Sequence, residues 1–123
     1  DITLVSYSKT MLTVLEAAKQ LEDAGISAEV IDLVTLSPWD KETVLESVKK
    51  TGHLCICHEA VKQGGFGAEI AATAAEEAFD SLKGPVLRLA APVTPVPFAP
   101  SMENKVRVHV DDIVNAITKT LKG

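Results

Sequence analysis

Basic residues are scarce in this chain. It holds 12 Lys and Arg against 17 Asp and Glu, which gives a formal net charge of −5. Phosphate binding requires clustered positive side chains, so this balance argues against nucleic acid or an anionic membrane as partner and favours a basic protein. A run approaching the roughly 20 apolar residues of a membrane-spanning helix is also missing. So is a signal-peptide pattern.

Cysteine is rare as well. Cys55 and Cys57 are the two in the chain, too few for a disulfide framework, and their arrangement fits a reducing compartment such as the cytoplasm or the mitochondrial matrix. The sequence opens at Asp1 without Met and runs directly into apolar residues, so we interpret it as a piece of a longer protein. Its 123 residues suffice for one domain with a core of its own.

The apolar pattern alternates between strands and helices. Strands are expected at residues 2–7, 28–33, 54–58 and 86–90. Helices are expected to begin at Ser8 or Thr10, at Pro38 to Asp40, at Gly67 (running to about Leu82) and at Asp111 or Asp112. Helix ends are indicated by the glycines at 25, 52 and 84 and by the proline at 85.

Two helices show their inward faces in the sequence. In the first helix the predicted apolar face carries Met11, Leu15, Ala18 and Leu21, flanked by Val14 and Ala17. In the last helix the expected inward residues are Ile113, Val114, Ile117 and Leu121.

Four strand–helix units with short connections predict parallel pairing and right-handed crossovers. The fold class is therefore α/β, a three-layer α/β/α sandwich with a parallel sheet in strand order 2-1-3-4. That order places a crevice at the carboxyl ends of the first and third strands. Ser8, Lys9, His58 and Glu59 are expected to lie there.

The stretch HEAVKQGGFGAE (58–69) looks most like a chemical site. Gly65, Phe66 and Gly67 match a dinucleotide-binding fingerprint at only two of its three glycines, and they follow the third strand instead of the first. We interpret these glycines as a sharp turn that lets the Ala-rich helix approach the sheet closely.

The sequence gives little support for a metal site or for a catalytic nucleophile. On a strand, Cys55 and Cys57 share one face while His58 points to the other, and zinc usually needs four ligands. His58 and Glu59 also lack the second histidine of an H-E-x-x-H motif, and Ser8 has no G-x-S-x-G elbow around it. We therefore assign no catalytic, cofactor-binding or metal-binding residue to this domain, and we expect His58 and Glu59 to make polar interface contacts.

Four stretches carry a family resemblance: EVIDLVTLSPWDKETVLESVKKTGHL (29–54), HEAVKQGGFGAEIAA (58–72), PVLRLAAPVTPVPFAP (85–100) and DDIVNAI near the end. Together they resemble the transketolase C-terminal domain, in the form found in the β subunit of thiamine-diphosphate-dependent 2-oxo acid dehydrogenases. The resemblance covers residues 1–123 as one transketolase C-terminal-like domain. Trp39 after Pro38 resembles branched-chain enzymes, whereas PVPFAP resembles pyruvate or acetoin enzymes.

This resemblance implies a role within a larger oxidoreductase that decarboxylates pyruvate or a branched-chain 2-oxo acid. Thiamine diphosphate with magnesium would sit between two other domains, and the isolated domain would be inactive. Its implied partners are a second β subunit, the α subunit in a heterotetramer, and the basic subunit-binding domain of the acyltransferase core. Family members usually carry an antiparallel edge strand before the position of Asp1, so without it the second strand would be an unprotected sheet edge.

Two aromatic residues are further interface candidates. Trp39 is expected to be half exposed at a helix start, and Phe98 lies in the proline-rich segment 92–100. One alternative stays open, namely a stand-alone regulatory or small-anion-binding module. It would use the crevice around Ser8, Lys9, His58 and the Gly64–Gly67 run, with an anion at the helix N-terminus. The substrate and the compartment are not decided by the sequence.

Overall fold

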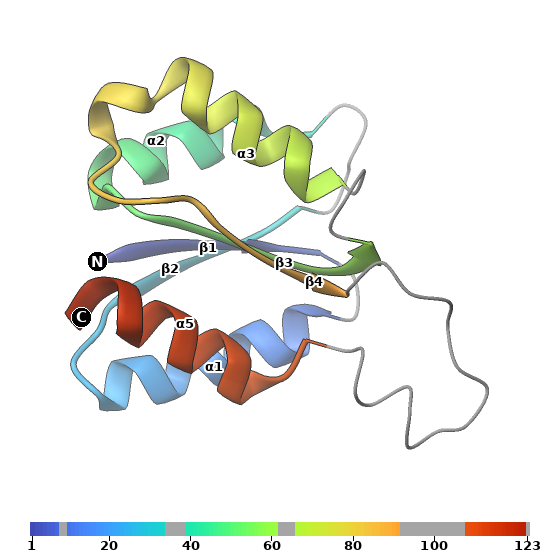
Figure 1. Cartoon of the computed structure of the whole chain (residues 1–123), viewed down its shortest axis with the longest axis vertical. Coiled ribbons are helices and arrows are strands. Elements are labelled where there is room, and N and C mark those ends of the chain that lie inside the picture. The colour runs from blue at the N-terminus through green and yellow to red at the C-terminus, as the bar shows by residue number, and fades with distance from the viewer. Residues whose placement is uncertain (8–9, 34–38, 62–65, 92–107, 123) are drawn as a thin grey trace.

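The computed structural model describes residues 1–7, 10–33, 39–61, 66–91 and 108–122. Along the chain the elements are β1 (Ile2–Ser6), α1 (Thr10–Asp23), β2 (Ala28–Asp32), α2 (Lys41–Thr51), β3 (Leu54–Val61), α3 (Phe66–Glu77), the short 3₁₀ helix η1 (Phe79–Ser81), β4 (Leu87–Ala91) and α5 (Val110–Lys122). Figure 1 shows the sheet between two helix layers, with α2 and α3 on one face and α1 and α5 on the other. The predicted three-layer sandwich is confirmed.

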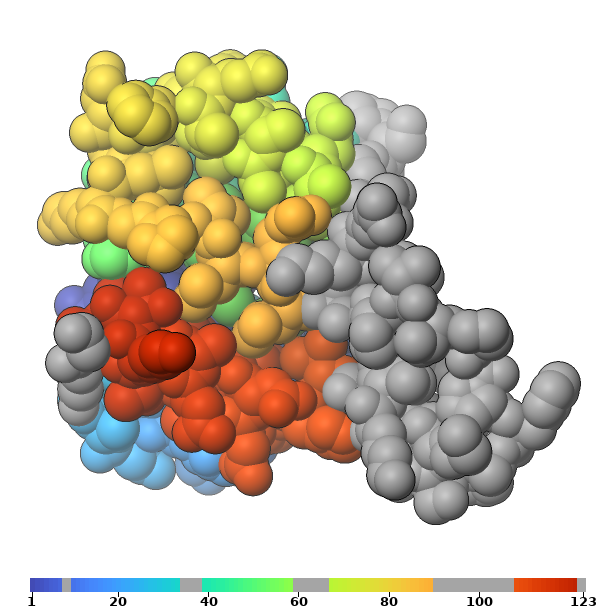
Figure 2. All heavy atoms as spheres, in the orientation of Figure 1, coloured from blue at the N-terminus to red at the C-terminus, as the bar shows by residue number. Residues whose placement is uncertain are grey.

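The sheet has the predicted strand order, β2-β1-β3-β4. All three pairings are parallel; Val5, for example, is opposite Ile31 of β2 and Ile56 of β3. Within the described residues β2 and β4 are the sheet edges, and Figure 2 shows β4 (orange) reaching the surface between the two helix layers. The chain runs from β1 to β2 and then returns to the other side of β1, so the carboxyl ends of β1 and β3 form the switch point.

Helix α2 begins and ends where the sequence predicts. The Asp40 carboxylate accepts hydrogen bonds from the Thr43 backbone N–H at 3.3 Å and from the Thr43 hydroxyl at 2.6 Å. These bonds lower the pKa of Asp40. Gly52 ends the helix in the left-handed conformation, with a φ of 80°, and its N–H donates to the Val48 carbonyl.

The inward face of α1 differs from the prediction. Its buried residues are Thr10, Val14, Ala17 and Leu21, whereas Leu15 is 51% exposed. The predicted face was therefore wrong at Leu15, because the stripe that packs on the sheet is rotated toward Val14. Periodicity alone allowed either Leu15 or Val14 to face the sheet, since apolar residues occupy too many adjacent positions on this helix.

Three element boundaries also needed correction. Strand β3 continues to Val61, so Glu59 lies within the strand together with His58 and not in the loop after it. Helix α3 ends at Glu77, and η1 replaces its predicted last turn. Helix α5 begins at Val110, which places both aspartates in its first turn, and the Asp112 carboxylate accepts from the His109 N–H at 3.0 Å. The expected inward residues of α5 are confirmed, with Ile113 and Ile117 fully buried.

Each face of the sheet has its own core. The α1/α5 face packs Ile2, Leu4, Val14, Ala17, Leu21, Ile26, Cys55, Cys57, Ile113 and Ile117. The α2/α3 face packs Val5, Leu33, Val44, Leu45, Val48, Leu54, Ile56, Ile70, Ala74 and Ala78. No helix in the described part of the chain is long and apolar enough to cross a membrane.

Candidate functional site

At the switch point, β1 and β3 are joined by contacts between neighbouring strands. Ser6 is the last residue of β1 and is paired with Cys57 of β3. Its buried hydroxyl donates a hydrogen bond of 2.6 Å to the Cys57 carbonyl. This bond ties the carboxyl end of β1 to β3.

His58 fills the space beside this pair. Its side chain points to the α2/α3 face, opposite to Cys57, and the residue is 1% exposed. The imidazole stacks on the Tyr7 ring, with ring centroids 5.9 Å apart and an interplanar angle of 15°. Burial raises the pKa of the Tyr7 phenol, so this ring stays neutral near pH 7. The contacts of His58 described here lie inside the domain, not on its surface.

Gly67 explains why this packing is possible. A Cβ atom placed on Gly67 would lie 2.3 Å from Nε2 of His58 and 3.3 Å from a methyl carbon of Ile56. Ordinary side-chain contacts are much longer, so the first turn of α3 passes over the imidazole only because residue 67 has no side chain. The prediction that Gly67 allows close approach of helix and sheet is confirmed.

The contact between His58 and Gly67 bears on the small-anion alternative. An anion at the N-terminus of α3 would need room beside the first backbone N–H groups of the helix. The imidazole of His58 lies against Gly67 at this point. The described residues therefore give the small-anion alternative no support.

The other predicted site residues divide into three groups. Trp39 packs on the α2/α3 core and keeps part of its surface exposed, as expected for a half-buried indole. The backbone of Glu59 belongs to β3, and Phe66 is the first residue of α3. Ser8, Lys9, Gly65 and Phe98 lie outside the described residues.

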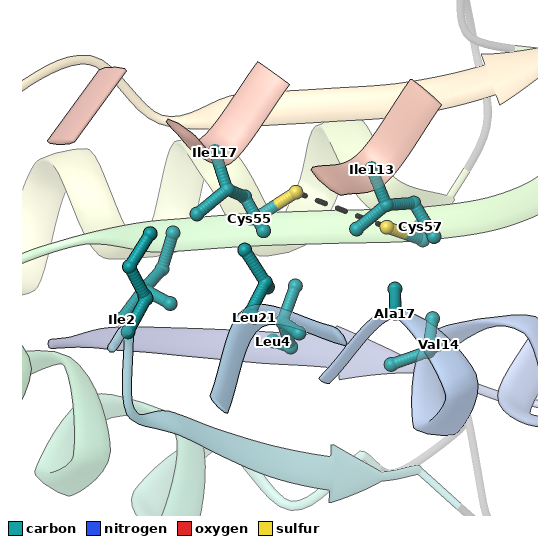
Figure 3. Packing of buried hydrophobic residues seen from close by; sticks show 10 residues of the cluster. Ile2, Leu4, Val14, Ala17, Leu21, Cys55, Cys57, Ile113 and Ile117 are labelled. Atoms are coloured by element: carbon teal, nitrogen blue, oxygen red, sulfur yellow. Dashed lines mark hydrogen bonds between the residues drawn. The ribbon is translucent and has the colours of Figure 1, made fainter. Parts of the chain in front are cut away.

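The two cysteines form a buried thiol pair on the other face of β3. Their Sγ atoms are 3.8 Å apart, and both residues are fully buried. Figure 3 shows the pair between Ile113 and Ile117 of α5 and the apolar side chains of α1. The hydrogen bond with Cys57 and the burial raise the pKa of Cys55, which keeps this thiol protonated. The interpretation as small buried hydrophobes is confirmed.

The sequence did not indicate a hollow at the opposite end of the sheet, beside the residues that precede β1 and β3. It has a volume of about 320 Å³ and is lined by Asp1, Gly25, Ile26, Thr51, His53, Lys83 and Leu121. The side chain of Lys83 lies across Gly52, and the Lys83 backbone N–H donates to the Gly52 carbonyl at 2.8 Å. Burial, followed by the nearby Lys83 charge, lowers the pKa of His53. The glycines at positions 25, 52 and 84 mark these turns in the sequence, but spacing alone does not show that the turns converge.

Possible metal ligands do not cluster in the described part of the chain. In this part of the chain, no group of three or more His, Cys, Asp and Glu side chains could bind a metal ion. Magnesium prefers several oxygen ligands, and the buried pair at β3 offers sulfur instead. The buried thiol pair at β3 is thus not a magnesium site.

Comparison with known proteins decides the family. The family "Transketolase, C-terminal domain" matches residues 1–113. The chain belongs to this family. On the solved structure of a "Split gene transketolase, inactive beta4 tetramer", the chain superposes with a TM-score of 0.79 at 32% sequence identity, over 99% of this chain and 38% of that one. The predicted fold of a transketolase C-terminal domain is therefore confirmed.

Two curated relatives of this transketolase C-terminal domain are β subunits. It is 44% identical to the mitochondrial pyruvate dehydrogenase E1 component subunit beta of Dictyostelium discoideum, over 94% of this chain and 33% of that protein. It is 47% identical to the mitochondrial 2-oxoisovalerate dehydrogenase subunit beta 2 of Arabidopsis thaliana, over 94% of this chain and 34% of that protein. The chain thus spans about a third of the curated relatives it matches.

Proposed function

We propose that this chain is the C-terminal domain of the β subunit of the decarboxylase component of a 2-oxo acid dehydrogenase complex. One observation carries the proposal: identity above 40% extends over 94% of the chain to the β subunits of both a pyruvate and a 2-oxoisovalerate dehydrogenase. A domain that shared only the fold would be expected to diverge more on its surface, where assembly contacts lie.

In this role the domain supports assembly and docking. Its proposed partners are a second β subunit, an α subunit in a heterotetramer, and the basic subunit-binding domain of the acyltransferase core. The net charge of −5 favours that basic partner. The solved relative is a tetramer of β subunits, which supports self-assembly within the family.

The chemistry belongs to the rest of the enzyme in this proposal. Thiamine diphosphate would supply the decarboxylation chemistry and, with its magnesium, would bind outside this domain, so the isolated domain would be inactive. Pyruvate and a branched-chain 2-oxo acid both remain as substrates, because the two relatives differ in this respect. The proposed location is the mitochondrial matrix, in line with the word mitochondrial in the names of these relatives, or the cytoplasm of a bacterium.

A chimera tests the proposal. The matching third of the Arabidopsis 2-oxoisovalerate dehydrogenase β subunit is replaced with residues 1–123, and the chimera is produced with its α subunit. We expect a heteromeric enzyme that oxidises 2-oxoisovalerate within about tenfold of the parent, a difference of about 1.4 kcal/mol in the barrier. The parent β subunit is the control. A soluble, folded chimera that fails to bind the α subunit would contradict the proposal.

A further inference from the structure

The buried thiol pair of β3 holds two reactive atoms close together. Cys55 and Cys57 are both free thiols. They share one face of the strand, and their Sγ atoms are 3.8 Å apart. The proposed function gives them no chemical role. Two thiols in contact are the reactants of an intrachain disulfide, and a strand in the middle of a sheet is an unusual place for such a bond.

An extended strand holds the pair slightly too far apart for an unstrained disulfide. Two residues of strand span about 6.6 Å between Cα atoms. Disulfides most often join Cα atoms about 5.5–6 Å apart, with a bond of about 2.05 Å between the sulfurs. The sulfurs would have to close from 3.8 Å to that bond length, so β3 would have to shorten between the two cysteines. A disulfide of this kind stores strain and is readily reduced, which is typical of regulatory disulfides.

Two features of β3 allow this shortening. The pairing of β3 with β4 is regular from Cys55 to Cys57 but shifts in register between Cys57 and Val61, and such irregularities are where strands bend. Ile56 lies between the cysteines, and its side chain faces the α2/α3 core. Drawing the cysteines together sharpens the pleat and pushes Ile56 toward α3, where a Cβ on Gly67 would lie 3.3 Å from it. Shortening on the thiol face is therefore felt on the other face.

Helix α5 controls access to the thiols. Both cysteines are fully buried, and Figure 3 shows Ile113 and Ile117 of α5 lying over them. The hydrogen bond with Cys57, together with burial, raises the pKa of Cys55, and a protonated thiol is not a nucleophile. Ile113 and Ile117 are the only buried side chains among those described for α5, so few fully buried groups hold this helix to the sheet. Local opening of α5 is the step that admits an oxidant.

We propose that Cys55 and Cys57 form a reversible redox modification site, which a low-molecular-weight disulfide such as glutathione disulfide oxidises to an intrachain disulfide when α5 opens. One cysteine thiolate attacks the oxidant, whose S–S bond breaks, and this step yields a mixed disulfide and one reduced thiol. The other cysteine thiolate then attacks the sulfur of the first cysteine and displaces the second reduced thiol. Two electrons and two protons pass from the pair to the oxidant.

The product is compatible with the core but not with an unchanged strand. A disulfide is neutral, so the apolar surroundings formed with α1 and α5 can hold it without burying a charge. The bond nevertheless contracts β3 between its two neighbours in the sheet. The oxidised domain is therefore less stable than the reduced one, whereas a structural disulfide stabilises the fold.

Oxidation of the purified chain with glutathione disulfide, followed by alkylation and intact mass measurement, tests the site. We expect the main product to be a monomer that has lost two hydrogen atoms, carries no alkyl group and recovers both thiols in dithiothreitol. Cys57→Ala should instead retain one glutathione on Cys55, because the second attack is no longer possible. A chain that forms only mixed disulfides, or only disulfide-linked dimers, would overturn the proposal.

The rate of oxidation tests the role of α5. Ile117→Ala removes one of the two buried contacts of this helix and should accelerate disulfide formation about tenfold or more. Leu12→Ala is the matched control, because Leu12 is 77% exposed on α1, and should leave the rate unchanged. If Ile117→Ala does not fold, urea below the unfolding midpoint of the original chain should accelerate the reaction by a similar factor. A rate that neither Ile117→Ala nor urea increases would overturn access through α5.

The oxidised chain itself tests the contraction of β3. Its urea midpoint should be lower than that of the reduced chain. The NMR signals of the Tyr7 ring should shift as well, because this ring stacks on His58, which lies under Gly67. An oxidised chain with an equal or higher midpoint would show that the bond does not strain the strand, which would overturn the switch. The chimera experiment uses no oxidant, so a failure of this inference is distinguishable from a failure of the proposed function.

Discussion

The two faces of β3 pack against their helix layers in different ways. Toward α1 and α5 the strand presents Cys55 and Cys57, which contact each other and apolar side chains (Figure 3). Toward α2 and α3 it presents Ile56 and His58, and the imidazole lies against the backbone of Gly67. The first face packs side chain on side chain, whereas the second packs a ring on a residue that has no side chain.

This difference determines which substitutions each face tolerates. Side chains around the cysteines can adjust to a small change in volume more readily than a helix backbone can. The helix backbone over His58 moves only if the whole of α3 moves. The imidazole face should therefore be the more sensitive to added atoms, and the thiol face should be sensitive mainly to added polarity.

Gly67→Val is expected to have the largest effect. The first added carbon already falls 2.3 Å from the His58 ring, so either the ring must leave its stacked position on Tyr7 or α3 must shift. We expect a loss of about 2–3 kcal/mol in the free energy of unfolding, measured by urea denaturation.

A double-mutant cycle separates this clash from a general loss of helix stability. Gly67→Ala should be destabilising in the original chain but clearly less so in a His58→Ala background, where the ring is absent. An equal cost in both backgrounds, or an unchanged midpoint for Gly67→Val, would show that His58 does not limit the approach of α3.

Cys57→Ser tests the thiol face with a smaller expected effect. The substitution puts a hydroxyl into the apolar core formed with α1 and α5, beside the Cys55 sulfur, which is a weak acceptor. The expected cost is about 1–3 kcal/mol of unfolding free energy. Cys57→Ala is the matched control and should cost about 1 kcal/mol through lost volume alone. If serine were tolerated better than alanine, the face would be more polar than its packing indicates.

The strand order and the faces of β3 could be predicted from the sequence because they depend on local pattern. Continuous apolar runs separated by helices specify a parallel sheet, and the period of two assigns Cys57 and His58 to opposite faces. Capping at Asp40 and termination at Gly52 follow from side-chain chemistry within a few residues. These features need no knowledge of distant contacts.

The role of His58 could not be predicted in this way. Whether a histidine at a switch point faces solvent or lies under a helix depends on where α3 crosses it, and that crossing is set by Gly67, nine positions away. The burial of α1 was misjudged at Leu15 for a related reason: neighbouring apolar residues offered two faces, and packing on the sheet selected one. In both cases tertiary contacts decided between locally equivalent arrangements.

The last prediction turns from the buried His58 to His53, which directly precedes the same strand. His53 is partly buried near Lys83, and its pKa is lowered by burial and then by that charge. Since its pKa is lower in the folded chain than in the unfolded one, the unfolded chain binds more protons below about pH 6.5, and stability should fall as pH decreases through this window. We expect the drop in melting temperature between pH 7.5 and pH 5.5 to be smaller in His53→Gln than in the original chain. The pKa of His53, followed by NMR of its ring protons, should lie below 6.5 and rise in Lys83→Met. An identical pH dependence in His53→Gln and the original chain would exclude His53 as its source.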